Sequence, residues 1–175
     1  MKIFNHTIYA IITVLVTLLQ ISAIRSMTER SFITLPLILL IVYLLLRGFH
    51  FTLIHGLIAG FVLDLYSPLP FGTYAITFLI IVSLGSITLR SYLAQRSSLP
   101  LFSLAVLSSV FFYLILEMTE YITSSISGSA QHIFFSGSFF LWLFIAALIN
   151  GVCVLLIYRL FSISRAYKLK PYMVR

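Results

Sequence analysis

Charge is scarce in this chain of 175 residues, since only 9% of them are Asp, Glu, Lys or Arg and only four are acidic. Soluble domains carry roughly 25% charged and about 45–50% apolar residues, whereas 61% of this chain is hydrophobic. A soluble fold of this size has too little interior to hide so much apolar surface, and disordered chains are far less hydrophobic. The composition therefore excludes both classes and predicts a protein whose solvent is a lipid bilayer.

Cysteine is also nearly missing, because Cys153 is the single one. One cysteine forms no intrachain disulfide, and no Cys/His spacing typical of a zinc site occurs. The 11 basic residues outnumber the four acidic ones, but they lie beside apolar segments, where they determine membrane topology. We therefore expect no nucleic-acid partner, no metal and no cofactor.

Long apolar segments, separated by short polar ones, are abundant. A transmembrane helix needs about 20 apolar residues and satisfies its own backbone hydrogen bonds in lipid. The pattern predicts an all-α membrane protein, a six-helix transmembrane bundle that forms a single domain over residues 1–175 with an uncleaved first span. The expected spans cover residues 8–24, 32–46, 49–66, 73–89, 101–121 and 139–158. The second span is short and contains Pro36, so it is either a tilted short helix or half of a re-entrant pair.

The distribution of basic residues predicts the orientation of these spans. With a cytoplasmic N-terminus and six spans, only Arg25 and Arg30 of the 11 basic residues face the outside. This bias agrees with the positive-inside rule. We expect both termini in the cytoplasm, and a basic tail over 159–175 that attracts anionic membrane lipids.

Acidic residues inside the spans are the first candidates for a functional site, because each costs roughly 2.5–3.5 kcal/mol on insertion scales. Asp64, Glu117 and Glu120 are predicted near the outer leaflet, and the two glutamates share a helix face. We expect an outer-leaflet polar cluster of these three with Arg25 and Arg30. The cluster is either a set of structural salt bridges or a binding or coupling site. Catalysis is not expected, because no nucleophile or metal motif accompanies the acids.

A second candidate is the helix face formed by Gly56, Gly60 and Asp64, which are spaced by four residues. Small residues at this spacing let two helices approach closely. A turn rich in Pro and Gly follows and ends at Gly72. The face either packs against a neighbouring helix of the same bundle or docks a partner's helix.

Uncharged polar residues within the other spans are expected to pack internally. Thr13, Thr17 and Gln20 share one face of the first span, turned away from lipid. His55 and Asn150 are expected to hydrogen-bond across helices, and a ligand-binding role is the alternative.

The block from Gly56 to Asp64, followed by Pro68, Gly72 and Thr73-Tyr74, resembles the central signature of MreD, the rod shape-determining membrane protein family of bacteria. That signature is a G-x-x-x-G-x-x-x-D helix, a short turn, and a glycine that opens the next helix. The length, the near absence of loops and the basic tail are also similar to MreD. The acidic pair Glu117 and Glu120 lies outside the signature, so no family role is assigned to it.

The resemblance implies a fold and a function. MreD is similar in fold to the substrate-binding subunits of energy-coupling-factor vitamin transporters. The implied function is a non-enzymatic scaffold of the cell-elongation machinery in the bacterial inner membrane, which binds MreC. Through that complex it links MreB filaments to RodA, an elongation penicillin-binding protein and peptidoglycan synthesis. Gly56, Gly60, Asp64 and Gly72 would shape a helix face and pocket at the outer leaflet, which holds either the partner's span or a lipid-linked wall precursor.

Two alternatives belong to other functional classes. A vitamin-binding subunit that docks on an ATPase-driven partner has the same fold, and it needs a lined central cavity. A transporter of protons or small solutes would use Asp64, Glu117 and Glu120 as a relay. That relay needs the acids at the membrane midplane, whereas they are predicted near one face.

Overall fold

The computed structural model describes residues 2–24, 32–92, 99–127 and 137–164. Within these ranges every regular element is a helix, so the predicted all-α fold is confirmed. The elements are α1 (Lys2–Leu19), its π-helical continuation η1 (Gln20–Ile24), α2 (Leu35–Arg47), α3 (Phe49–Leu65), α4 (Thr73–Tyr92), α5 (Leu99–Ser127) and α6 (Gly137–Ser164).

Most helices begin and end within about three residues of the predicted spans, but α1 begins six residues earlier, at Lys2, and α5 and α6 each end six residues later, at Ser127 and Ser164. The fifth span was expected to end at residue 121, but α5 continues through a segment rich in serine and threonine to Ser127. The hydroxyl of Thr123 donates to the carbonyl of Thr119 at 2.5 Å, and that of Ser124 donates to the carbonyl of Tyr121 at 2.9 Å. These bonds to the preceding turn satisfy the hydroxyls inside the helix, so serine and threonine do not end it.

Two helical segments within the described ranges are long and apolar enough to cross a membrane, Leu101–Ile126 and Gly137–Leu160. The apolar parts of α1 to α4 are shorter, at 10–17 residues each. These lengths support a membrane protein, and they leave the six-span arrangement as an expectation.

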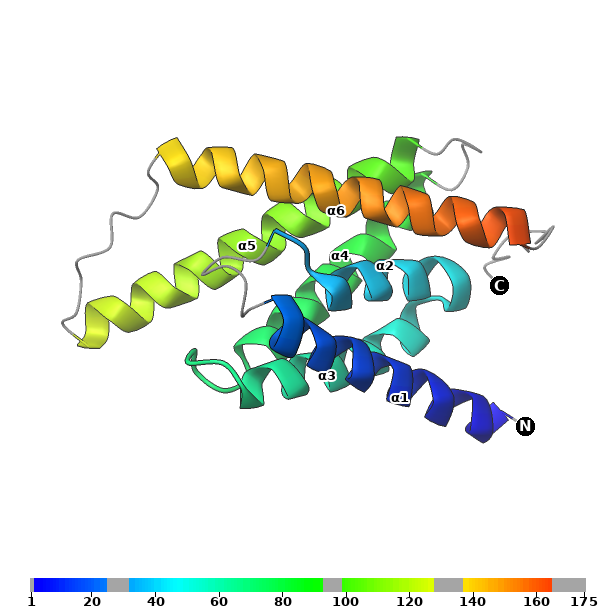
Figure 1. Ribbon diagram of the computed structural model, residues 1–175, viewed down its shortest axis with the longest axis horizontal. Helices are drawn as coiled ribbons and strands as arrows, with labels where there is room; N and C mark the ends of the chain where they lie inside the picture. Colours follow the sequence, from blue (N-terminus) through cyan, green and yellow to red (C-terminus); the bar gives the residue numbers. More distant parts are fainter. Residues whose placement is uncertain (1, 25–31, 93–98, 128–136, 165–175) are drawn as a thin grey trace.

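The centre of the bundle is α2, which packs against α1, α3, α4, α5 and α6 (Figure 1). Its sequence explains this position, because Tyr43 and Arg47 are its only polar residues and the other positions are aliphatic or proline. Leu37, Leu40 and Ile41 are at most 3% exposed. Around α2, the helices α3 and α4 form one antiparallel hairpin, and α5 and α6 pack along each other.

The ends of the helices gather at two opposite ends of the bundle (Figure 1). The start of α1, the junction of α2 with α3 and the end of α6 lie at one end. The turn between α3 and α4, the end of α5 and the start of α6 lie at the other. The helix ends predicted to be cytoplasmic are thus on the same side of the molecule, and the turn that carries the glycine and aspartate motif is on the opposite side.

Candidate functional site

The first part of the site is the close contact between α3 and α4 at Gly60. A Cβ atom at Gly60 would lie 2.4 Å from the Cα and 2.6 Å from the nitrogen of Ala75. Both are backbone atoms of α4, so only glycine fits at this position. At Gly56, one turn earlier, the nearest atoms to a Cβ would be side-chain atoms at 3.7 Å, which is an ordinary contact. The small-residue face therefore packs inside the bundle, and its tight point is Gly60.

Asp64 continues this face and caps the neighbouring helix. Its side chain is buried at 4% exposure, and its carboxylate oxygens accept hydrogen bonds from the backbone N–H groups of Tyr74 at 2.9 Å and Ala75 at 3.2 Å. The first N–H groups of a helix have no partner within that helix, and a carboxylate there also interacts favourably with the helix dipole. Asp64 of α3 therefore satisfies the first turn of α4.

Gly72 sets the geometry of the turn that brings these groups together. Its φ is +98°, in the left-handed region that glycine adopts without steric cost. The N–H of Ile76 donates to the carbonyl of Gly72 at 2.9 Å, which begins the hydrogen-bond ladder of α4. Gly60, Asp64 and Gly72 thus belong to one hairpin unit. The sequence indicated the helix face and the turn, but the capping of α4 by Asp64 was missed; an acid followed by a short turn to the next helix was the available signal.

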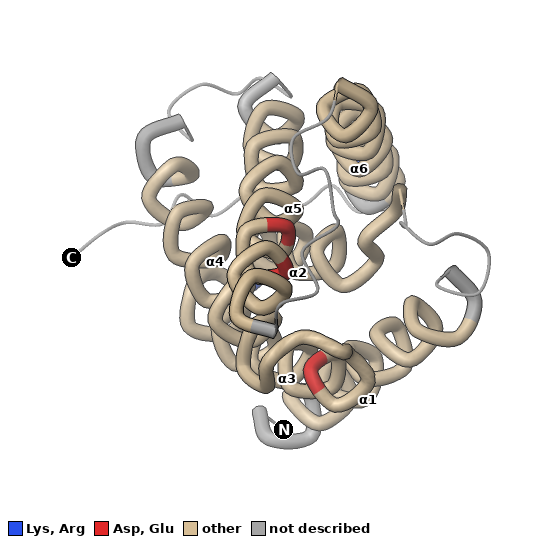
Figure 2. The backbone as a smooth tube through the Cα atoms, turned by 90° about the vertical axis from the view of Figure 1, so that its left-hand side faces the viewer, with Lys and Arg blue, Asp and Glu red and all other residues tan. Residues whose placement is uncertain are grey.

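Of the other predicted members of the outer cluster, the structure describes the two glutamates of α5 but not the two arginines. Glu117 of α5 is partly buried, and Glu120 is exposed. Viewed from this end of the bundle, the acidic segments lie in two separate places, on α5 and beside α3 (Figure 2). Arg25 and Arg30 lie outside the described residues, so their pairing with the acids stays a prediction.

A second group of polar residues surrounds the start of α2, and its members were not predicted to lie together. Asn150 of α6 accepts a hydrogen bond from the backbone N–H of Thr34 at 3.1 Å. The side chain of Gln20 accepts from the N–H of Leu35 and donates to the carbonyl of Ile33, both at 2.9 Å. The extended backbone that leads into α2 is therefore satisfied by side chains of α6 and of η1.

Tyr113 of α5 completes this group, which we call the α2-entry network (Gln20, Thr34, Tyr113 and Asn150). Its hydroxyl lies 2.7 Å from the hydroxyl of Thr34 and 3.5 Å from the amide nitrogen of Asn150. At 13 residues, α2 is about 20 Å long, too short for a hydrocarbon core of about 30 Å. Non-helical backbone within a bilayer is tolerated where protein buries it. The second predicted span is thus a short helix that begins inside the bundle.

Substitution of Asn150 by leucine is expected to lower the free energy of unfolding by about 1–3 kcal/mol, because the buried N–H of Thr34 loses its acceptor. Ser109→Ala is the matched control, since Ser109 is equally buried but its hydroxyl bonds the carbonyl of Ala105 in its own helix. Thermal unfolding of the purified variants in detergent measures the difference. Equal unfolding midpoints for the two variants would contradict the supporting role of Asn150.

His55 lies in a cluster of rings at the opposite end of the bundle. Nδ1 of His55 lies 2.8 Å from the carbonyl of Phe51, one turn earlier in α3, so this hydrogen bond is within its own helix. Because a carbonyl only accepts, Nδ1 is the donor. The other ring nitrogen is buried without a partner among the described residues. The ring of His55 stacks on that of Phe51 in the same helix, with centroids 4.1 Å apart, and its contact with the ring of Tyr43 at 5.4 Å links α3 to α2.

Neither cluster brings together three or more metal-ligating side chains within the part of the chain that the structure describes. Comparison of the chain with protein-family models, with curated proteins and with solved structures finds no match in any of the three. The assignment of function therefore depends on the residues and on the geometry of this bundle.

Proposed function

We propose that the chain is a multi-pass protein of the bacterial cytoplasmic membrane, with both termini inside. Large apolar side chains exposed on the outer helices support this placement, with 59% of Leu15, 65% of Ile87 and 64% of Leu141 accessible. Large exposed apolar side chains occur on each of the six described helices, as expected of a surface that contacts a membrane or a partner. In the proposed arrangement, the other helices surround most of α2, so this short helix does not need to cross the bilayer by itself.

Within that membrane, the proposed role is that of a non-enzymatic scaffold of the cell-elongation machinery, in the manner of MreD. The observation that carries the proposal is the α3–α4 hairpin. Three residues of the MreD-like signature, Gly60, Asp64 and Gly72, each have a defined task in building it. A signature with this structural role indicates a rigid platform at the outer end of the bundle.

The outer end of this hairpin carries an exposed aromatic patch suited to contact with MreC. Phe61 and Phe71 stack with their ring centroids 6.0 Å apart, and they are 46% and 67% exposed. Leu65 and Tyr66 beside them are 70% and 57% exposed. Aromatic side chains are enriched at protein interfaces. In this proposal, Gly60 and Asp64 hold the platform together from inside, and the aromatic patch contacts the partner.

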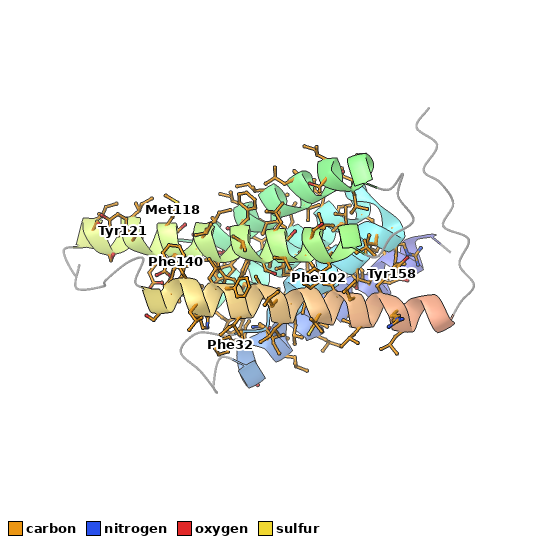
Figure 3. All side chains as sticks on the ribbon, turned by 90° about the horizontal axis from the view of Figure 1, so that it is seen from above. Phe32, Phe102, Met118, Tyr121, Phe140 and Tyr158 are labelled. Atoms are coloured by element: carbon orange, nitrogen blue, oxygen red, sulfur yellow. The ribbon has the colours of Figure 1, made fainter. Side chains whose placement is uncertain are left out.

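The packing between α5 and α6 favours a scaffold over a vitamin-binding subunit. The ring of Trp142 lies 4.8 Å from that of Tyr113 and 5.8 Å from that of Phe32, between centroids. Further along the same helices, the ring of Phe102 packs against Gly151, where a Cβ would come within 2.8 Å of it. Side chains of α5 and α6 meet along the shared length of the two helices (Figure 3). A binding subunit needs a lined cavity, whereas side chains fill this region.

Affinity purification from bacterial membranes in mild detergent, followed by mass spectrometry, tests the proposal. We expect a single-span protein with an outer β-rich domain to co-elute, together with cell-wall synthases. Recovery of a pair of ATPases with a coupling membrane subunit would instead support vitamin uptake.

A photo-crosslinking amino acid placed at Phe71 is expected to capture the single-span partner, because the aromatic patch faces outward. The same amino acid at Ile87, which is similarly exposed but lies towards the other end of α4, serves as the control. The captured proteins are identified by mass spectrometry. Equal capture from both positions would show that the patch is not a specific contact surface.

A further inference from the structure

A groove of about 320 Å³ runs between α1 and α2 and is closed on one side by Ile157 of α6. Its walls are aliphatic over most of its length, with Ile12 and Val16 on α1 facing the side chains of α2. The α2 wall extends from Leu35 at one end to Arg47 at the other. The groove is therefore apolar along most of its length, and its polar residues, Tyr9, Tyr43 and Arg47, lie towards one end.

That polar end is formed by Arg47 and Tyr9. The guanidinium of Arg47 donates to the hydroxyl of Tyr9 at 2.5 Å and lies 4.8 Å from the centre of its ring. The acidic residues that the structure describes lie elsewhere: Asp64 at the far end of α3, and Glu117 and Glu120 in the second half of α5. Arginine has five N–H donors, and Arg47 is exposed. A tyrosine, rather than a carboxylate, holds this cation at the mouth of the groove.

The length of the groove matches one leaflet of a bilayer. From Leu35 to Arg47 the helix advances twelve residues, which at 1.5 Å each is about 18 Å. The hydrocarbon core is about 30 Å thick, so one leaflet contributes about half of that. Arg47 lies at the end of the bundle predicted to face the cytoplasm, where the leaflet is rich in anionic lipid.

We propose that this groove binds one anionic phospholipid of the cytoplasmic leaflet. An acyl chain lies between α1 and α2, and the phosphate accepts hydrogen bonds from Arg47 and Tyr9. The planar guanidinium suits a phosphate, to which it can donate two parallel hydrogen bonds. The proposal depends on the membrane placement argued above, and it does not depend on the identity of a protein partner. The bound lipid would fasten α1 to the central helix.

Native mass spectrometry of the purified chain tests the proposal. The protein in a non-ionic detergent is titrated with phosphatidylglycerol, and phosphatidylcholine is the zwitterionic comparison. We expect one retained phosphatidylglycerol, with retention lowered at least tenfold in Arg47→Gln and in Ile12→Trp, which fills the groove. Arg159→Gln removes the same charge at an exposed position outside the groove, and Ile11→Trp adds the same ring on the outer face of α1. Both control variants are expected to retain the lipid.

Three results would overturn the proposal. Equal retention by all four variants would show unspecific lipid around the bundle. Equal losses in Arg47→Gln and Arg159→Gln would show attraction by net charge alone. Capture of a co-purifying polypeptide by a crosslinker at Ile12, without retained lipid, would show that the groove receives a helix. These experiments are made on the purified protein, so their results do not depend on whether the elongation partner is found.

Discussion

Replacing Gly60 by alanine is expected to prevent the native packing of α3 against α4, because the added Cβ would lie 2.4 Å from a backbone atom of Ala75. A helical backbone yields less than the end of a flexible side chain, so the two helices must separate. Overpacking of this kind costs about 1–3 kcal/mol, and sometimes more. The loss is expected even though alanine is intrinsically better than glycine in a helix by about 1 kcal/mol.

Gly56→Ala is the matched control, because it makes the same change one turn away on the same helix face. Its nearest neighbours would be at 3.7 Å, so we expect unchanged or slightly raised stability. The midpoint of thermal unfolding, followed by fluorescence-detected size exclusion in detergent, separates the two variants. If Gly60→Ala unfolded at the same temperature as Gly56→Ala, the close approach of α3 and α4 would be refuted.

Asp64→Ala is expected to have the second large effect, because it leaves the N–H groups of Tyr74 and Ala75 without their acceptors in a buried position. Hydrogen bonds to a charged group contribute about 1.5–3 kcal/mol, so the variant should lose on the order of 2–4 kcal/mol of stability. Asp64→Asn keeps one acceptor oxygen and should fall between the wild type and the alanine variant. Hydrogen exchange at the amides of residues 74 and 75 should become faster in the same order.

Glu120→Ala is the control: it removes one carboxylate from an exposed position, so the unfolding temperature should not change. A decrease in stability from the wild type to Asp64→Asn and then to Asp64→Ala is the result expected if Asp64 caps α4. A stable Asp64→Asn protein with native amide exchange that no longer recovered its partner would show instead that the carboxylate contacts that partner. If Asp64→Ala were as stable as the wild type, Asp64 would not be needed to stabilise the hairpin.

The residues of the small-residue face have equal spacing in the sequence, but they have different structural roles. Gly56, Gly60 and Asp64 have equal spacing on α3, yet only Gly60 contacts a neighbouring backbone and only Asp64 satisfies one. The tight part of the motif is therefore close to the turn. A helix that begins in an apolar environment needs its first N–H groups satisfied, and the turn brings the acid of the preceding helix to them.

Hydropathy by itself determined the helical class of this protein and the positions of its helices. Apolar segments and their breaks are local properties of the sequence, so the bounds of α3 and α4 follow from them closely. The small-residue face and the turn at Gly72 were equally local. The end of the fifth span was placed too early, because the hydroxyls of serine and threonine in the last turns of α5 bond within their own helix.

Only the tertiary structure decided which polar atoms meet. Thr34 and Asn150 are 116 positions apart, and Tyr9 and Arg47 are 38 apart. Their contacts depend on how the five other described helices pack around α2, which no spacing along the chain encodes. The same holds for Asp64, whose partners lie on the next helix. In a bilayer, buried polar atoms must find partners within the protein, and their pairing is set by the packing of the bundle.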